Sequence, residues 1–246
     1  MEIEISATSA LVLNWTNNHI WKTKEAIEYM DEIDLSEGDS ILKLFSDEEN
    51  YMHTQSVTNR KCFMRQSAVN FLKKCKAKKI NGQVIILAAG IAPLSIELAA
   101  LFPHAAIFDV DKYLMQEKEM DIRKMFKDKL NNIQFVKSDI TNIAELESRL
   151  LKDGWKPDEK TLLIMEGITY YLKEVDLKYI LEYFCNKNTS LACDFLLNYD
   201  DIHESTRKFG LDVFGKIKES VGLDFVESYA PEYFMNMLSE IGFKNP

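Results

Sequence analysis

The sequence predicts an α/β protein built on a doubly wound, mostly parallel sheet. Short apolar runs rich in β-branched residues alternate with longer stretches of helical periodicity from residue 81 to about residue 197. Runs that are apolar throughout are typical of strands buried on both faces, and strands that alternate with helices form parallel sheets covered on both sides. The predicted strands are 84–87, 106–111, 133–136, 161–166 and 190–197, and the helices between them are 95–102, 113–130, 143–151 and 174–184.

Residues 1 to about 80 precede the first strand and are predicted to be helical. The stretch from Trp21 to Met30 spaces its apolar residues three and four apart, and a second helix is predicted from Asn59 to Lys79. The acidic run 47–50 between these helices is predicted to be a solvated loop. We therefore expect one domain, 1–246, in which a helical lid (1–80) covers an α/β core (81–246).

Composition and charge limit the partners and the cellular compartment. The chain is 46% hydrophobic, which excludes a disordered protein, and its net charge of −9 disfavours binding to nucleic acid or to a membrane surface. No apolar run is long enough to span a bilayer, and the amino-terminal residues are acidic where a secretory signal is basic. The four cysteines are scattered and have no histidine cluster beside them, so we expect reduced thiols, no metal site and a cytoplasmic protein. The oligomeric state stays open.

Small and acidic residues follow four of the predicted strands. Ligands of open α/β sheets bind beyond the carboxyl ends of the strands, so these residues are expected to share one cleft. Small residues let a ligand approach the backbone, and a carboxylate about twenty residues later can accept both hydroxyl protons of a ribose. The residues are Ala88, Ala89 and Gly90 after the first strand, Asp109 and Asp111 at the end of the second, Asp139 after the third, and Glu166 with Gly167 after the fourth.

This order of residues predicts a nucleoside-type ligand. Taken singly, the Ala88–Gly90 turn reads as an ordinary link between strand and helix, and each acid reads as a helix cap. The turn lacks the full GxGxxG set, and the sequence has no phosphate-binding lysine loop, so a nucleoside without a pyrophosphate is favoured over a dinucleotide. S-adenosylmethionine is the candidate cofactor.

At these positions the sequence resembles the leucine carboxyl methyltransferase family, which includes natural-product O-methyltransferases. The resemblance covers residues 60–243 and implies a Rossmann-like methyltransferase sheet. Because the family continues through closing strands, we expect a shortened carboxyl-terminal end of the sheet. The matching segments are Cys62–Arg65 (the family's F-x-R), Leu87–Gly90 (LGxG), Phe108–Asp111 (E/D-V-D), Glu166–Leu172 (E-G/C-x-x-x-Y-L/M), Phe195–Asp200 (F-x-x-N-Y-E) and Phe209–Gly210 (F-G).

The resemblance also implies a role for each cofactor-binding residue. Ala88 departs from the family because it replaces the first glycine of the turn, which puts a Cβ atom where the backbone is normally bare. The implied contacts are Arg65 with the methionyl carboxylate, Gly90 under the methionyl group, Asp109 with the ribose, Asp139 and Ile140 beside the adenine, and Glu166 with the ammonium group.

The implied activity is transfer of a methyl group from S-adenosylmethionine to a carboxylate or hydroxyl oxygen, with a small molecule as the expected acceptor. A carboxylate needs no base, whereas a hydroxyl does, and His203, Tyr170 and Tyr199 are the candidates for that base. Two alternatives remain at this stage: a methyltransferase for a protein's carboxyl terminus, and a non-catalytic regulatory protein that binds S-adenosylmethionine.

Overall fold

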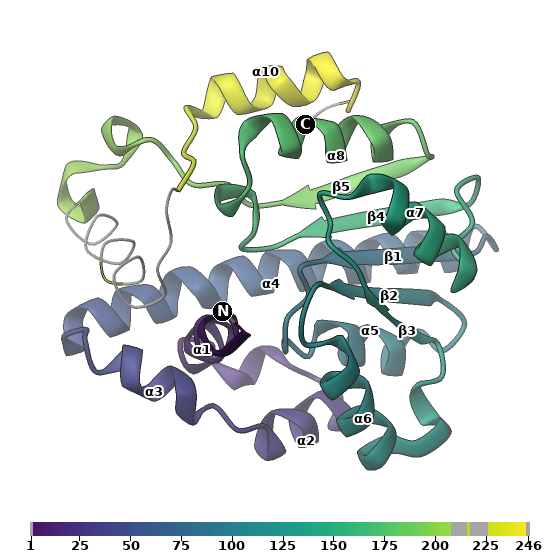
Figure 1. Ribbon diagram of the computed structural model, residues 1–246, viewed down its shortest axis with the longest axis horizontal. Helices are drawn as coiled ribbons and strands as arrows, with labels where there is room; N and C mark the ends of the chain where they lie inside the picture. Colours follow the sequence, from purple (N-terminus) through teal and green to yellow (C-terminus); the bar gives the residue numbers. More distant parts are fainter. Residues whose placement is uncertain (1, 208–215, 217–225, 245–246) are drawn as a thin grey trace.

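The computed structural model of the chain describes residues 2–207, 216 and 226–244, and it confirms the predicted fold class. Five parallel strands form one sheet in the order β3-β2-β1-β4-β5 (Figure 1). The strand order reverses between β1 and β4, and ligands of such sheets bind beside that switch point. The strands are β1 (Gly82–Leu87), β2 (Ala106–Asp111), β3 (Ile133–Lys137), β4 (Lys160–Met165) and β5 (Thr189–Cys193).

Helices cover both faces of the sheet, because the side chains of each central strand alternate between two apolar clusters. In β1, Val84 and Ile86 belong to the cluster on the face of α5 and α6, whereas Ile85 and Leu87 belong to the cluster on the face of α7, α8 and α10. The sheet is therefore buried on both sides. The covering helices are α5 (Leu94–Leu101), α6 (Met115–Phe126), α7 (Ile143–Lys152), α8 (Glu174–Cys185) and α10 (Pro231–Ile241).

The amino-terminal region is helical, as the sequence predicted. Its longest helix, α4, runs alongside the sheet and extends beyond the carboxyl ends of the strands, and α1 lies across the space that these ends face (Figure 1). The helices are α1 (Glu2–Asn14), α2 (Lys24–Glu32), α3 (Ser36–Leu42) and α4 (Asp47–Ala77).

The loop predicted at 47–50 is wrong, because these residues form the first turn of α4. Ser46 caps this turn: its hydroxyl accepts a hydrogen bond from the Glu49 N–H at 3.3 Å, and the Glu49 carboxylate accepts one from the Ser46 N–H at 2.6 Å. This reciprocal capping box satisfies backbone groups that would otherwise lack partners, and acidic side chains suit the positive end of a helix dipole. The acidic run therefore starts a helix here.

The last strand of the sheet, β5, is shorter than the sequence predicted. Strand β5 ends at Cys193, whereas the sequence predicted a strand to Leu197; beyond Cys193, Leu197 makes only an isolated bridge with Tyr229. The backbone leaves the sheet at Asp194, beside the end of β4. Among the helices in the described ranges, none is both long and apolar enough to cross a membrane.

Candidate functional site

A cavity of about 1030 Å³ lies at the carboxyl ends of the strands. Its wall is formed by the ends of β1, β2, β3 and β4, by one face of α4 and by residues of α1. Sites for one drug-sized ligand have volumes of about 300–1000 Å³. The cavity therefore has room for a nucleoside-sized ligand together with a second small molecule.

The turn after β1 exposes its backbone to this cavity. Ala88 and Gly90 both adopt left-handed backbone conformations, with φ of 53° and 50°. The Gly90 N–H donates a hydrogen bond to Asp111 at 2.9 Å, and a Cβ atom on Gly90 would lie only 3.0 Å from the Ser9 hydroxyl of α1. Glycine is therefore favoured at position 90, whereas Ala88 adopts a similar conformation at a cost of about 1–2 kcal/mol.

The two aspartates of β2 project from the same face of the strand but have different environments. Asp109 is fully buried, and its Oδ2 atom contacts Lys118 Nζ at 2.7 Å and the Ser95 hydroxyl at 2.5 Å. Its Oδ1 atom is enclosed and has no hydrogen-bond partner among the described residues. Asp111 is the last residue of the strand; it is also buried, with 8% of its surface exposed, and it accepts hydrogen bonds from the N–H groups of Gly90 and Tyr113.

Both aspartates of β2 line the cavity, so both are candidates for binding a ribose. The resemblance implies Asp109, whose carboxylate lies in the cavity wall but is fully buried and already neutralised by Lys118. Asp111, two residues further along the strand, presents its carboxylate where the strand ends and the cavity begins. Asp111 is therefore the better candidate, and Asp109 holds α6 against the sheet through Lys118.

The residues after β3 line the cavity as the sequence predicted. Asp139 and Ile140 both lie in its wall, next to the buried Ser138. Asp139 pairs with Lys112 at 2.8 Å and accepts a hydrogen bond from the Thr141 N–H at 3.0 Å. Burial opposes ionisation of Asp139, but Lys112 and Thr141 outweigh it and lower the pKa of this carboxyl group. Asp139 is therefore an ionised hydrogen-bond acceptor at the cavity edge.

Glu166 is the centre of an ionic cluster at the end of β4. Its Oε1 atom accepts hydrogen bonds from Lys61 Nζ at 2.9 Å and from Arg60 Nε at 3.2 Å, both on α4. Arg60 also pairs with Asp194 at 3.6 Å and donates to the Tyr170 hydroxyl at 3.2 Å. We call these four charged residues, Arg60, Lys61, Glu166 and Asp194, the ionic cluster.

The electrostatics of the ionic cluster follow from its burial. Burial acts against the charge of Glu166, but Lys61 and Arg60 together outweigh it and hold the pKa of that carboxyl group below its usual value. Burial raises the pKa of Asp194, and the nearby charge of Glu166 adds to the increase. The cluster combines two cationic and two acidic side chains, so both signs of charge are available to an ammonium and a carboxylate on one ligand.

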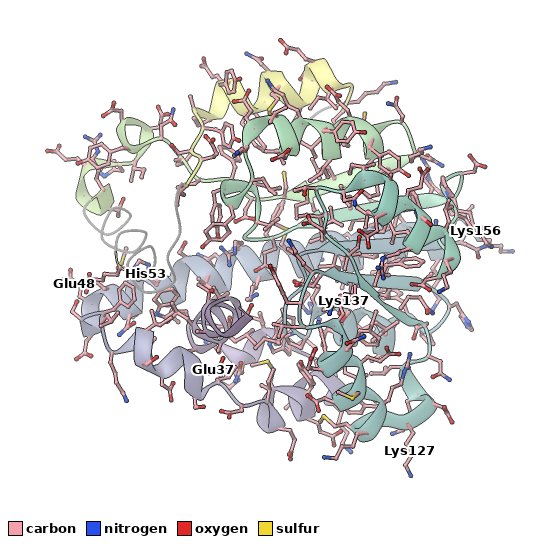
Figure 2. All side chains as sticks on the ribbon, viewed as in Figure 1. Glu37, Glu48, His53, Lys127, Lys137 and Lys156 are labelled. Carbon is pink, nitrogen blue, oxygen red and sulfur yellow. The ribbon has the colours of Figure 1, made fainter. Side chains whose placement is uncertain are left out.

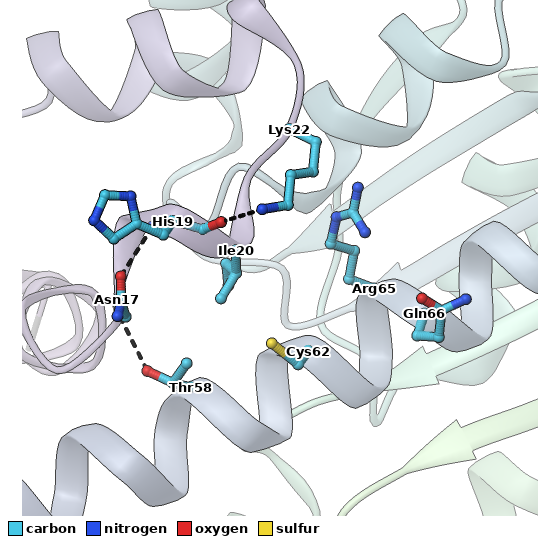
Figure 3. Close-up of a pocket in the computed structure, with 8 residues that line it drawn as sticks. All are labelled: Asn17, His19, Ile20, Lys22, Thr58, Cys62, Arg65 and Gln66. Atoms are coloured by element: carbon cyan, nitrogen blue, oxygen red, sulfur yellow. Dashed lines mark hydrogen bonds between the residues drawn. The ribbon is translucent and has the colours of Figure 1, made fainter.

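Arg65, which the sequence analysis assigned to the methionyl carboxylate, lies elsewhere. Its guanidinium group pairs with the buried Glu97 at 2.5 Å, and it lines a smaller cavity of about 270 Å³ together with Lys22 and Cys62 (Figure 3). Because Arg65 follows Arg60 by five residues, it points about 140° around the helix from Arg60. Arg60 and Lys61 were not predicted from the sequence, although both lie on the stripe of α4 that also carries the buried Val57 and Met64.

Of the three proposed bases, only Tyr170 lies in the wall of the large cavity. Burial raises the pKa of its hydroxyl, which already accepts a hydrogen bond from Arg60. Tyr199 is 45% exposed in a 3-10 turn, and His203 contacts the Ser205 hydroxyl at 2.8 Å; neither lines the cavity. Phe209 and Gly210 lie outside the described residues. Within the residues that the structure describes, no group of three or more His, Cys, Asp or Glu side chains could hold a metal ion.

The chain matches one protein family model and several solved structures. A family model described as leucine carboxyl methyltransferase matches residues 23–184. The structure of a DUF574 family protein from Streptomyces avermitilis has a TM-score of 0.59 at 12% identity, covering 94% of this chain and 81% of that one. A proposed methyltransferase from Thermobifida fusca has a TM-score of 0.60 at 11% identity, covering 86% and 75% of the two chains.

A third similar structure is that of mitomycin 7-O-methyltransferase, with a TM-score of 0.50 at 16% identity; the match covers 96% of this chain and 61% of that one. At these identities the likeness to solved structures establishes the fold alone. A comparison with curated proteins gives no match.

Proposed function

The chain belongs to the leucine carboxyl methyltransferase family, and from that premise we propose that it methylates an oxygen atom of a small-molecule acceptor. It is a methyltransferase that uses S-adenosylmethionine. The observation on which the proposal rests is the cavity itself, where the carboxylate at the tip of β2 and the ionic cluster lie on one continuous wall.

The donor groups of the cavity fit this cofactor. A carboxylate in the cavity wall at the end of β2 suits ribose hydroxyl groups, and the bare backbone at Gly90 leaves room for the chain that joins the nucleoside to the amino-acid group. The ionic cluster offers carboxylates to an ammonium and cations to a carboxylate. The residues proposed to hold the cofactor are Asp111 at the ribose, Asp139 and Ile140 at the adenine, Ala88 and Gly90 beside the methionyl chain, and Glu166, Arg60 and Lys61 at its amino-acid group.

The cofactor supplies an activated methyl group, so the protein's main task is to bring the acceptor oxygen into line with it. Holding two reactants in such a geometry can provide a large part of a rate enhancement. The cavity volume supports a small acceptor, because space for a second small ligand remains beside the cofactor on the same wall. The enclosing helices α1 and α4 also keep water from the bound reactants.

Calorimetry with S-adenosylmethionine tests the cofactor site. Asp111→Asn and Lys61→Met are expected to weaken binding at least tenfold, because each removes a charge that contacts the cofactor. Lys73→Met is the matched control, since Lys73 is an exposed cation on the same helix outside the cavity. Unchanged affinity in both site variants would refute the assignment of these residues.

Turnover distinguishes the enzyme from a binding protein. The wild-type chain is expected to form S-adenosylhomocysteine when it is mixed with small carboxylic or hydroxylic acceptors. Binding of the cofactor without any product, across such a panel, would favour the non-catalytic alternative. Methylation of a protein's carboxyl terminus but of no small molecule would favour the other alternative.

A further inference from the structure

A buried histidine with an unsatisfied ring nitrogen lies in the same cavity. His53 lies in the amino-terminal third of α4 (Figure 2); it is only 9% exposed and lines the large cavity. Its Nε2 atom is enclosed and has no hydrogen-bond partner among the residues that the structure describes. Leaving a buried polar atom without a partner costs about 1–3 kcal/mol, so such an atom calls for a specific explanation. A bound ligand that supplies the missing hydrogen bond provides one.

The surroundings of His53 favour a flat, apolar ligand with one polar group. The imidazole lies 4.8 Å from the Trp15 ring and 5.4 Å from the Phe45 ring, measured between ring centroids. Val57, one turn further along α4, also lines the cavity and belongs to the same apolar cluster as Trp15 and Phe45. Aromatic side chains pack well against the rings of small molecules, and a single polar group then fixes the ligand's orientation.

Burial keeps the ring of His53 neutral. Burial lowers the pKa of the imidazole from its usual 6.5; Glu49 on α4 acts in the opposite direction, and Lys216 acts in the same direction as burial. Glu49 and Lys216 are themselves paired at 2.7 Å, so neither is a free charge beside the ring. At neutral pH the imidazole is therefore uncharged and able to accept a proton.

His53 lies beyond the cofactor end of the cavity, on the side away from the sheet. It precedes Arg60 of the ionic cluster by seven residues, which places it two helical turns, or about 10 Å, further along the same face of α4. The residues proposed to hold the adenine and the ribose lie at the strand tips. The space beside His53 is therefore the part of the cavity that remains for the acceptor.

The cations of the cavity wall do not favour a carboxylate in that space. In the described part of the wall, Arg60 and Lys61 belong to the proposed site of the cofactor's amino-acid group, and Lys112 is paired with Asp139 at the adenine end. A buried carboxylate without a cationic partner is strongly unfavourable, whereas a hydroxyl group needs only a hydrogen-bond partner. A neutral imidazole with a free nitrogen is such a partner.

We propose that the methyl acceptor is a ring-bearing alcohol or phenol and that Nε2 of His53 takes its hydroxyl proton. This inference rests on the proposed function. The O–H bond breaks as the proton moves to Nε2, and the oxygen lone pair forms the new O–C bond to the transferred methyl group. The C–S bond breaks, its electron pair stays on sulfur, and the imidazolium then releases its proton to solvent.

A binding experiment tests whether His53 accepts the hydroxyl proton, and it requires no methyl transfer. The protein is saturated with S-adenosylhomocysteine, and 4-nitrophenol is added as the probe because its ionised form is coloured. If His53 accepts the proton, the bound probe ionises at lower pH in the wild type than in His53→Gln, with its ionisation constant increased about tenfold. His104→Gln is the matched control, since His104 is exposed and lies outside the cavity. Failure of the probe to bind, or equal ionisation in wild type and His53→Gln, overturns the proposal.

Turnover gives a second and independent test. With weakly acidic phenols, His53→Gln is expected to lower kcat/KM about 10²–10⁴-fold, and with a phenol that is already ionised the loss is expected to be much smaller. The affinity for S-adenosylmethionine stays unchanged in this variant. Transfer to carboxylic acids alone, or full activity of His53→Gln, contradicts the role of His53 and leaves the proposed function intact. Loss of cofactor binding in the wild type contradicts the proposed function instead.

Discussion

The buried ion pair between Asp109 and Lys118 allows a direct test of whether Asp109 stabilises the fold while Asp111 binds the cofactor. Both side chains have no exposed surface, and Lys118 Nζ lies 2.7 Å from Asp109 Oδ2 and 2.7 Å from the carbonyl oxygen of Ala92. Lys118→Met keeps the length of the side chain but removes the ammonium, which leaves a buried carboxylate whose one remaining side-chain partner among the described residues is the Ser95 hydroxyl. Breaking a buried pair in this way costs about 3–5 kcal/mol.

The free energy of unfolding in urea, followed by tryptophan fluorescence, measures this cost. The double variant Lys118→Met/Asp109→Asn is expected to lose less than the sum of the two single variants, because neither charge then remains unpaired. Lys124→Met, at an exposed position of the same helix, is the control and is expected to change stability by less than about 0.5 kcal/mol. The reasoning fails if Lys118→Met costs under 1 kcal/mol, or if Asp109→Asn abolishes cofactor binding at unchanged stability.

Three further predictions concern the turns and charges of the site. Ala88→Gly is expected to leave the free energy of unfolding unchanged or to raise it by up to about 1 kcal/mol. The substitution relieves the left-handed strain at φ 53°, and this gain equals or exceeds the cost of a more flexible unfolded chain. Ala88→Val should lower the free energy of unfolding. Gly167→Ala places a Cβ atom 3.3 Å from both Arg60 and Tyr170 at φ 70°, so calorimetry should show weaker cofactor binding together with lower stability. Because the pKa of Glu166 is lowered in the folded state, its contribution to stability is complete above the pKa of the unfolded carboxyl and is lost as pH falls through the lower folded value. Urea midpoints measured from neutral to acid pH should show this loss, and Glu166→Gln should remove that part of the pH dependence.

The sheet could be predicted from the sequence because its strands are buried on both faces. An apolar run such as 84–87 between two glycines leaves little choice of structure, and β2 was predicted with the same bounds that the structure shows. The start of α4 was not predicted, because an acidic run such as 47–50 is also typical of a solvated loop. The sequence did contain the deciding signal, a serine at position 46 followed three residues later by Glu49.

The site was predictable where the sheet fixes the position and not where a helix or a loop does. Residues directly after parallel strands, such as Asp139 and Glu166, must come to the same edge, and both line the cavity. The choice between Arg60 and Arg65 depends on the rotational phase of a long helix, which a short motif does not define. His203 follows β5 at a distance of ten residues, and no local pattern fixes the direction of such a segment.

A single helix sets the spacing between the two ends of the proposed site. Arg60 and Lys61 meet Glu166 from α4, and His53 lies on the same helix two turns away, within one continuous stretch that begins at the Ser46 cap. An α-helix is stiff over this length, so the distance between the cofactor group and His53 does not depend on the position of α1. The residues of α1 that complete the wall, among them Val12, can therefore alter the shape of the acceptor space without changing that distance. Within the proposed mechanism, substitutions at Val12 should change which acceptors are used, whereas substitutions on the cavity face of α4 should change whether transfer occurs.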